Sequence, residues 1–374
     1  MNIAFVDLKA QQKRIASSLD ARLKKVLAGG QYILGPEVGE LEGVLAGFAG
    51  AKHCVAVSNG TDALRIALMA WGVGPGDAVF LPAFTYTATA EVVLLSGAEP
   101  VYVDVDEADY NLDLGDLARR LAVVRKAGKL RPRVVLAVDL FGQPADYVAL
   151  NRFAEAEGLL VLADGAQSYG ASREGRRVGT LAAVTATSFF PSKPLGCYGD
   201  GGALLTGDDE LAAAYRSIRA HGQGKDKYEI VRLGMNARLD SLQAAVLLAK
   251  MEIFPDEIGR RNRVARLYGE RLANHVVTPM VAASAESVWA QYTIRVDDRD
   301  GVQRRLKEKG VPTQIYYPKP MHLQEAYRQA DCGEGALPVS ERLAKHVLAL
   351  PMHPYLQDAE IDHVAEAVIA AIRN

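Results

Sequence analysis

Short apolar runs alternate with helix-period segments from about residue 53 to residue 205. The runs are continuously apolar, as expected for strands of a sheet that is covered on both faces. The segments between them carry apolar residues at helical spacing. This pattern predicts an α/β fold with a mostly parallel sheet covered by helices. The predicted strands are CVAVS (54–58), AVFLPAF (78–84), EPVYVDVD (99–106), RVVLAVDLFG (133–142), LLVLADGA (159–166), ATSFF (186–190) and GALLT (202–206).

One predicted turn from strand to helix has the residues of an anion site. The segment SNGTDALRIALMAWG (58–72) begins with small polar residues and ends at a glycine, as a capped helix would. The first turn of such a helix presents free N–H groups, and its dipole favours negative charge. Gly60 and Thr61 therefore belong to a candidate phosphate site. A tight turn with an ordinary helix cap explains the same residues equally well.

The second half of the chain has a different pattern. Helices are predicted over 238–254 and, with many charges, over 257–273, and Pro255 lies between them. Beyond that proline, SVWAQYTIRVDD (287–298), a charged helix near 300–310 and an amphipathic helix at 358–374 describe a small α+β domain. We therefore predict a large domain over 1–254 and a small domain over 255–374, with the N-terminal segment packed on the small domain.

The composition narrows the functional classes. The chain has 374 residues, of which 49% are hydrophobic, and a net charge of −2 with both signs interleaved. Charge therefore gives no support for binding to nucleic acid or to a membrane surface. The three cysteines are far apart and lack CxxC spacing, which favours a reducing, cytoplasmic location without a disulfide framework. No run of eighteen apolar residues occurs, so no membrane span is expected.

Other common site motifs are absent. The seven histidines lack a close ligand pair, so no metal site is expected. No GxGxxG follows a strand, and neither GxxxxGK[ST] nor GxSxG occurs. Dinucleotide, nucleoside triphosphate and common hydrolase chemistry therefore lack their usual motifs.

Two charged residues follow predicted strands as pyridoxal phosphate chemistry requires. Lys193 lies in the turn TSFFPSKPLGCYGDGG (187–202), and Asp164 ends the run LLVLAD. Lys193 can form an imine with the cofactor aldehyde, and Asp164 can keep the ring nitrogen protonated. Burial and the cationic ring would lower the lysine pKa and supply a neutral amine. A single lysine is more often a solvated surface residue, but this segment carries little charge.

Further residues are candidates for cofactor contacts. Gln167 could reach the ring hydroxyl, although a turn or cap role is nearly as plausible from its spacing. Tyr86, in PAFTYTATAEVV, could stack on the ring, with core packing as its alternative. The hydroxyls of Thr61 and Ser188 could bind the phosphate. Lys225, Lys227 and Arg232 could fold over a diphosphate, or form an exposed loop of solvated charges.

Taken together, the motifs resemble the DegT/DnrJ/EryC1/StrS family of sugar-nucleotide aminotransferases over nearly the whole chain. They are YILGPEVGELE, SNGTDAL, PAFTYTATAE, GAEPVYVDVD, LFGQPAD, ADGAQSYGA, SFFPSKPLGCYGDGGA, GMNARLDSLQAAVL and YYPKPMH. The resemblance implies the type I aspartate-aminotransferase fold, pyridoxal 5′-phosphate as cofactor, and a homodimer with shared active sites.

The resemblance also implies roles for individual residues. Lys193 matches the Schiff-base lysine, and Asp164 matches the partner of the pyridine nitrogen. Among the remaining cofactor contacts, Gln167 matches the contact to the ring hydroxyl, Tyr86 the stacking aromatic, and Gly60, Thr61 and Ser188 the phosphate ligands. Asn236 matches a phosphate ligand from the neighbouring subunit. Residues expected near the donor or sugar are Arg238, Tyr316, Tyr317 and His322.

The implied reaction moves an amino group from L-glutamate, which becomes 2-oxoglutarate, to a sugar ketone. Members with similar lysine segments act on UDP-linked 2-acetamido sugars with a C3 ketone, for lipopolysaccharide or lipid A synthesis. Members commonly carry histidine where this chain has Tyr316, and a neutral tyrosine favours an uncharged C6. The 3-keto glucose form is therefore expected. The alternatives are the 3-keto hexuluronic acid, a 4-keto-6-deoxy sugar nucleotide, or a regulator that binds the cofactor without turnover.

Overall fold

The computed structural model describes residues 3–329 and 332–373. Its centre is a seven-stranded sheet in the order β1-β9-β8-β5-β4-β2-β3, in which β9 alone runs against the others. The predicted α/β class and all seven predicted strands are confirmed. The strands are β1 (His53–Val57), β2 (Asp77–Pro82), β3 (Glu99–Val103), β4 (Arg131–Val138), β5 (Leu160–Asp164), β8 (Val184–Ser188) and β9 (Gly202–Thr206). The predicted strand at 186–190 begins and ends two residues earlier, because Phe189 enters the loop that follows.

Helices cover both faces of this sheet, which explains the continuous apolar runs. Successive strand residues such as Val55 and Ala56 join apolar clusters on opposite faces. One cluster includes residues of α2 (Pro36–Ala49), α5 (Leu114–Ala127), α6 (Tyr147–Glu157) and α8 (Ser241–Met251). The other includes residues of α3 (Gly60–Ala70), α4 (Ala88–Leu95), α7 (Asp209–Ile218) and α11 (Pro338–His346).

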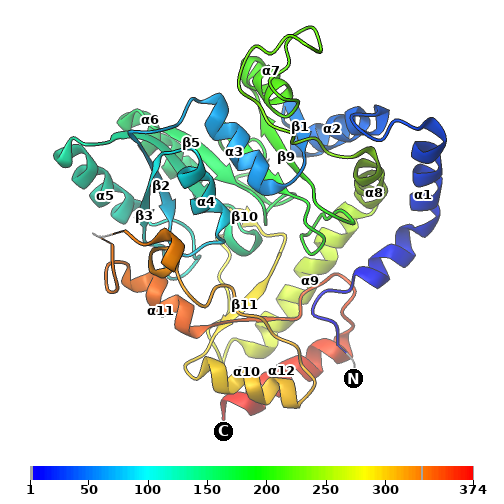
Figure 1. Ribbon diagram of the computed structural model, residues 1–374. Coiled ribbons are helices and arrows are strands. Elements are labelled where there is room, and N and C mark those ends of the chain that lie inside the picture. Colours follow the sequence, from blue (N-terminus) through cyan, green and yellow to red (C-terminus); the bar gives the residue numbers. More distant parts are fainter. Residues whose placement is uncertain (1–2, 330–331, 374) are drawn as a thin grey trace.

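A smaller layer lies below the sheet in Figure 1. It contains α9 (Phe254–Leu272), α10 (Arg299–Glu308), α12 (Asp358–Ile372) and the antiparallel pair β11 (Tyr292–Arg295) and β12 (Val347–Leu350). Ile3 lies in the same apolar cluster as these elements. Helix α9 contributes Phe254 to the sheet cluster and Tyr268 to the small cluster. Because one helix serves both clusters, the boundary near Pro255 stays a prediction.

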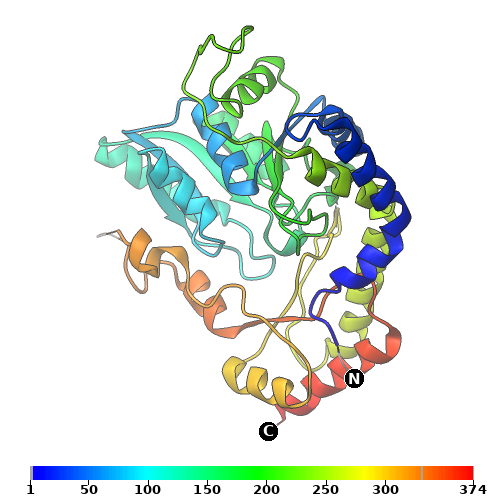
Figure 2. The ribbon, with the colours of Figure 1, turned by 45° about the vertical axis from the view of Figure 1, so that its right-hand side comes forward.

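The remaining elements connect these parts. Helix α1 (Leu8–Gly29) runs along the outside of the molecule and packs on α8, as Figure 2 shows. Three two-residue strands form a small sheet, and three 3₁₀ turns complete the described structure. They are β6 (Ser172–Arg173), β7 (Arg176–Arg177), β10 (Ala285–Glu286), η1 (Leu140–Gly142), η2 (Met321–Leu323) and η3 (Glu325–Tyr327). In the described part of the chain no helix combines the length and apolar content needed to cross a bilayer.

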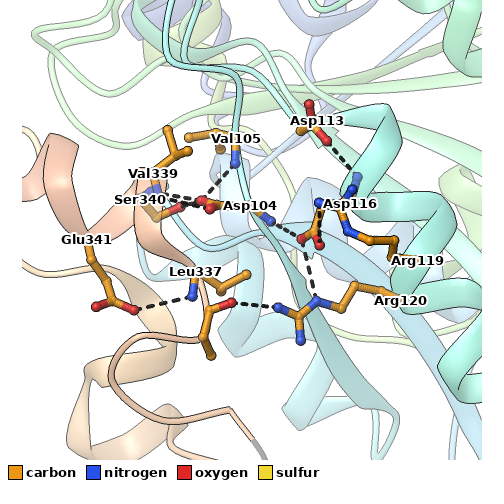
Figure 3. Close-up of polar contacts among 11 residues, drawn as sticks. Asp104, Val105, Asp113, Asp116, Arg119, Arg120, Leu337, Val339, Ser340 and Glu341 are labelled. Carbon is orange, nitrogen blue, oxygen red and sulfur yellow. Dashed lines mark hydrogen bonds and ion pairs between the residues drawn. The ribbon is translucent and has the colours of Figure 1, made fainter.

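Helix α11 is fastened to the sheet by several polar contacts (Figure 3), and Arg299 of α10 in the small layer also donates to its Ala344 carbonyl at 3.1 Å. The carboxylate of Asp104, just after β3, accepts hydrogen bonds from the amides of Val339 (2.9 Å) and Ser340 (2.8 Å). Arg120 of α5 donates to the carbonyl of Ala336 at 2.9 Å. A carboxylate at a helix N-terminus satisfies amides that have no partner within the helix. The chain beyond residue 254 therefore packs on both parts of the molecule.

Candidate functional site

The centre of the site is Asp164, the last residue of β5. Its side chain is buried and accepts hydrogen bonds from the Thr89 hydroxyl (3.0 Å) and the Ala166 amide (3.2 Å). No Lys, Arg or His within the described residues forms an ion pair with it at 4.0 Å or less. Burial raises the pKa of this carboxyl, and the two hydrogen bonds and the charge of Lys193 oppose that shift. A buried anion without a close cation calls for a positively charged partner.

Lys193 lies in the loop after the neighbouring strand β8. Its amide donates to the Phe190 carbonyl at 2.9 Å, which closes a tight turn. The side chain is half-buried. Burial lowers the pKa of the Lys193 amine, and the charge of Asp164 partly restores it. Because β5 and β8 are parallel neighbours, both groups lie at the same end of the sheet.

Gln167 stands in the turn after Asp164 and is held at both ends of its amide. Its oxygen accepts from the Phe141 amide at 2.7 Å, and its nitrogen donates to the Tyr317 hydroxyl at 3.2 Å. The rings of Tyr317 and Tyr86 lie 6.1 Å apart between centroids. The side chain of Tyr86 is 56% exposed, so its ring is not packed in the core. The structure thus brings Gln167, Tyr317 and Tyr86 together.

The predicted phosphate residues also meet at this end of the sheet. Helix α3 begins at Gly60, and the side chain of Asn59 caps it by accepting from the Asp62 amide at 2.7 Å. A Cβ on Gly60 would lie 2.6 Å from the Cβ of Ser188, so the two residues are in close contact. The amides of Gly60 and Thr61 have no acceptor among the described residues. They are therefore available to an anion.

Asn236 and Arg238 lie on the chain segment beside the C-terminal end of β1. Arg238 pairs with Val57 and is half-buried, and the Ser58 amide donates to the Ala237 carbonyl at 3.1 Å. Asn236 pairs with Ala220 and its side chain is exposed. No described contact joins Asn236 to Lys193 or Asp164, and its role in a neighbouring subunit stays a prediction.

The predicted substrate residues have different surroundings. Tyr316 is half-buried beside Tyr317, whereas His322 is 1% exposed and contacts Glu341 at 3.1 Å. Burial lowers the pKa of His322, and its contact with Glu341 opposes this. The structure therefore gives His322 a packing position, and contact with a sugar would require it to leave that position. Lys225, Lys227 and Arg232 are exposed.

The structure adds residues that the sequence did not single out. Thr89 contacts Asp164, and Phe141 contacts Gln167. Asp139 lies beside Asp164, because its amide donates to the Asp164 carbonyl at 3.1 Å. The buried Asp139 carboxylate accepts from the Ser168 hydroxyl (2.6 Å), the Tyr147 hydroxyl (2.7 Å) and the Ala145 amide (2.9 Å). Asp139 follows an apolar strand as Asp164 does, and that shared pattern could have identified it. Elsewhere, residues 3–329 and 332–373 contain no group of three potential metal ligands.

These residues fit pyridoxal 5′-phosphate. Asp164 is a buried carboxylate suited to a protonated ring nitrogen, Lys193 is an amine with a lowered pKa, and Gly60 and Thr61 present unpaired amides to a phosphate. Gln167 supplies a further polar side chain at this site. The donor set therefore suits an aromatic aldehyde that carries a phosphate.

Comparisons with known proteins agree with this chemistry. One relative is 51% identical over 98% of this chain and 99% of its own length, and is named UDP-2-acetamido-2-deoxy-3-oxo-D-glucuronate aminotransferase, from Pseudomonas aeruginosa. Another, from Acidithiobacillus ferrooxidans, is 38% identical over 98% of this chain and 97% of its own, and is named UDP-N-acetyl-3-dehydro-alpha-D-glucosamine 3-aminotransferase.

A crystal structure of a DegT DnrJ EryC1 StrS aminotransferase from Brucella abortus has a TM-score of 0.97 at 49% identity, with each chain fully covered. Residues 13–369 match the DegT/DnrJ/EryC1/StrS aminotransferase family. The chain therefore belongs to the DegT/DnrJ/EryC1/StrS aminotransferase family, whose members use pyridoxal 5′-phosphate.

Proposed function

We propose that this protein transfers the amino group of L-glutamate to the C3 ketone of a UDP-linked 2-acetamido-2-deoxy-3-keto sugar. The observation that carries the proposal concerns Asp164, a buried carboxylate that forms no ion pair within the described residues. It lies at the same end of the sheet as the half-buried Lys193, in the loop after the next strand. Relatives named for 3-oxo sugar substrates support the position of the ketone. An envelope glycan is the proposed destination of the product.

Each residue has a role in this proposal. Bound pyridoxal phosphate supplies a ring that withdraws electrons from the carbon next to the amino nitrogen. Lys193 holds the cofactor and then uses its Nζ to take the proton from the α-carbon of the donor and to return one to the sugar carbon. Asp164 keeps the proton on the ring nitrogen. Gly60, Thr61 and Ser188 bind the phosphate, Gln167 holds the ring hydroxyl, and Tyr86 covers the ring.

The group at C6 has two candidates. The Pseudomonas aeruginosa relative, at 51% identity, supports the glucuronate form. Tyr316, a neutral side chain beside Tyr317, supports the glucose form because it brings no positive charge to a carboxylate. We propose the glucuronate form as the first substrate to test and the glucose form as the second.

We also propose a homodimer in which Asn236 completes the phosphate site of the partner subunit. The loop before Asn236 exposes large apolar side chains, including Tyr228 at 84% and Leu233 at 83%. Exposed apolar groups beside a site indicate a surface that binds another protein chain. The size of the holoenzyme in solution tests the dimer. Mixing Asn236→Ala subunits with Lys193→Ala subunits then tests sharing, because only shared sites allow the mixture to contain one unaltered site.

A single-turnover experiment tests the reaction. The holoenzyme is first treated with L-glutamate, which converts the cofactor to its amino form and changes its absorbance. UDP-linked 3-keto sugars with and without a C6 carboxylate, and a 4-keto-6-deoxy sugar nucleotide, are then added separately, and products are read by mass. Amination of a 3-keto UDP-sugar is the expected result. No response to glutamate would favour a regulator that binds the cofactor, and amination of the 4-keto sugar alone would refute the C3 assignment.

A further inference from the structure

Lys250 is a buried lysine to which the proposed reaction gives no role. It lies on α8 and is 1% exposed. Its ammonium donates to the carbonyl of Gly196 at 2.5 Å and lies 4.4 Å from the centre of the Tyr198 ring. Within the described residues no carboxylate pairs with it at 4.0 Å or less. Burying an ammonium without an ion-pair partner is costly, so its position needs a compensating interaction.

That interaction is with the loop that carries Lys193, here called the lysine loop (residues 189–201). The loop is closed by hydrogen bonds from the Phe189 amide to Gly201 (2.7 Å) and from the Cys197 amide to Phe189 (2.7 Å). Gly196 is confined, because a Cβ there would lie 2.6 Å from the carbonyl oxygens of Phe190 and Pro191. The carbonyl that Lys250 contacts therefore belongs to the same tight turn as Lys193.

Helix α8 holds this loop at two neighbouring points. Gln243 accepts from the Tyr198 amide at 2.9 Å and donates to the Tyr198 carbonyl at 3.2 Å. Lys250, two turns further along the helix, holds Gly196. A hydrogen bond from a charged donor is about twice as strong as one between neutral groups. The single bond from Lys250 is thus comparable in strength to the two bonds from Gln243 together.

We propose that Lys250 is a positioning residue for Lys193: it fastens the lysine loop to α8 and so fixes the place of the Lys193 amine at the cofactor site. The cation–π contact with Tyr198 and the bond to Gly196 compensate for its burial. Burial lowers the pKa of Lys250 to about 8, and the titratable groups that face it, the Cys197 thiol of the loop and the Glu257 carboxylate of α9, oppose that shift. The proposal rests on Lys193 as the residue that binds the cofactor covalently.

The experiment measures covalent capture of pyridoxal 5′-phosphate by the apoenzyme, followed by absorbance. Lys250→Met removes the donor but keeps an unbranched apolar side chain. We expect capture at pH 7.5 to be about tenfold slower, because the amine is no longer held at the cofactor. Lys250→Arg restores a charged donor and is expected to recover most of the rate. Lys25→Met, on a lysine of α1 that is 66% exposed, is the matched control and is expected to match wild type.

Two further readouts separate positioning from general stability. Amide hydrogen exchange of the apoenzyme should be faster within residues 189–201 of Lys250→Met and unchanged in the central strands. The capture defect should also shrink at pH 10. Burial lowers the pKa of Lys250 to about 8, so wild type loses its charged donor at that pH, and alkaline solution deprotonates the Lys193 amine in both proteins. Thermal unfolding should be unchanged or shifted upward, since methionine removes a buried charge.

Several outcomes overturn the proposal. Capture and loop exchange equal to wild type in Lys250→Met would show that the contact positions nothing. Loss of capture together with faster exchange throughout the sheet would show a merely structural role. If Lys250→Met does not fold, Lys250→Gln is measured by the same criteria. Covalent capture by Lys193→Ala would instead refute the assignment of Lys193. Amide hydrogen exchange in Lys250→Met would still test whether Lys250 attaches the lysine loop to α8.

Discussion

Gln167 donates a hydrogen bond of 3.2 Å to the Tyr317 hydroxyl, although 150 residues separate them. The opposite end of the same amide accepts from Phe141. A donor at one end and an acceptor at the other set the orientation of the amide. The turn after β5 and the chain before η2 therefore share one polar contact at the proposed cofactor site.

Replacing Tyr317 by phenylalanine removes the acceptor while the ring remains. A neutral hydrogen bond contributes about 0.5–1.5 kcal/mol, so we expect kcat/KM to fall roughly two- to tenfold. Tyr215→Phe is the control, because the Tyr215 hydroxyl on α7 has no hydrogen-bond partner among the described residues, and it should change kcat/KM by less than about twofold. Equal effects of the two substitutions would contradict the role of the Gln167 contact.

Replacing Asp164 by asparagine removes the negative charge that we assign to the ring nitrogen. The carboxamide oxygen of asparagine can still accept from the Ala166 amide, and its NH2 group can donate to the Thr89 hydroxyl oxygen, so the fold should be retained. We expect kcat to fall on the order of a hundredfold or more, because the ring is no longer held protonated. Lys193→Ala should abolish turnover and leave only non-covalent binding. Turnover by Lys193→Ala without an added amine would refute its assignment.

Gly60→Ala tests the close approach of α3 to β8. The new Cβ would lie 2.6 Å from the Ser188 Cβ, and this overlap should destabilise the protein by about 1–3 kcal/mol. The shift should also weaken binding of the cofactor phosphate, measured by dialysis against pyridoxal phosphate. Gly39→Ala is the matched control, since it lies in α2 with nothing within 4 Å of its Cβ. Alanine there should stabilise the helix slightly.

Asp139 should make stability depend on pH. Burial raises its pKa to about 6, against hydrogen bonds from Ser168, Ala145 and Tyr147. Between the unfolded pKa near 3.8 and this value the folded protein binds the extra proton, so its contribution is complete below pH 4 and is lost as the pH rises through 6. The loss by pH 7 is on the order of 3 kcal/mol.

Asp139→Asn removes this titration. The free energy of unfolding of the variant, relative to wild type, should therefore rise between pH 4 and pH 7, as measured by urea denaturation. Tyr147→Phe keeps the carboxylate and removes one donor, so it should retain the pH dependence. An Asp139→Asn protein whose stability follows the wild-type curve across this range would exclude Asp139 as the titrating group.

The strands, their order of appearance and the two reactive groups are properties of the sequence by itself. An apolar run such as LLVLAD is buried on both faces wherever it packs, so it predicts a strand without knowledge of its neighbours. Residues that follow parallel strands must meet at one end of a sheet, which is why Lys193 and Asp164 could be paired from the sequence. The sequence motifs around these two residues indicated the family.

The contacts that hold those groups were decided by the tertiary structure. Thr89 reaches Asp164 across 75 residues, and Lys250 reaches Gly196 across 54. Lys250 lies in a helix where its spacing predicts nothing more than another charged residue, and only the tertiary structure shows that it is buried and contacts the lysine loop. The family motif likewise predicts that His322 lies near the substrate, but in the structure it is buried and contacts Glu341 of α11. The local pattern of apolar and polar residues indicates which residues are buried. Which distant residues contact each other depends on how the helices and the sheet pack together.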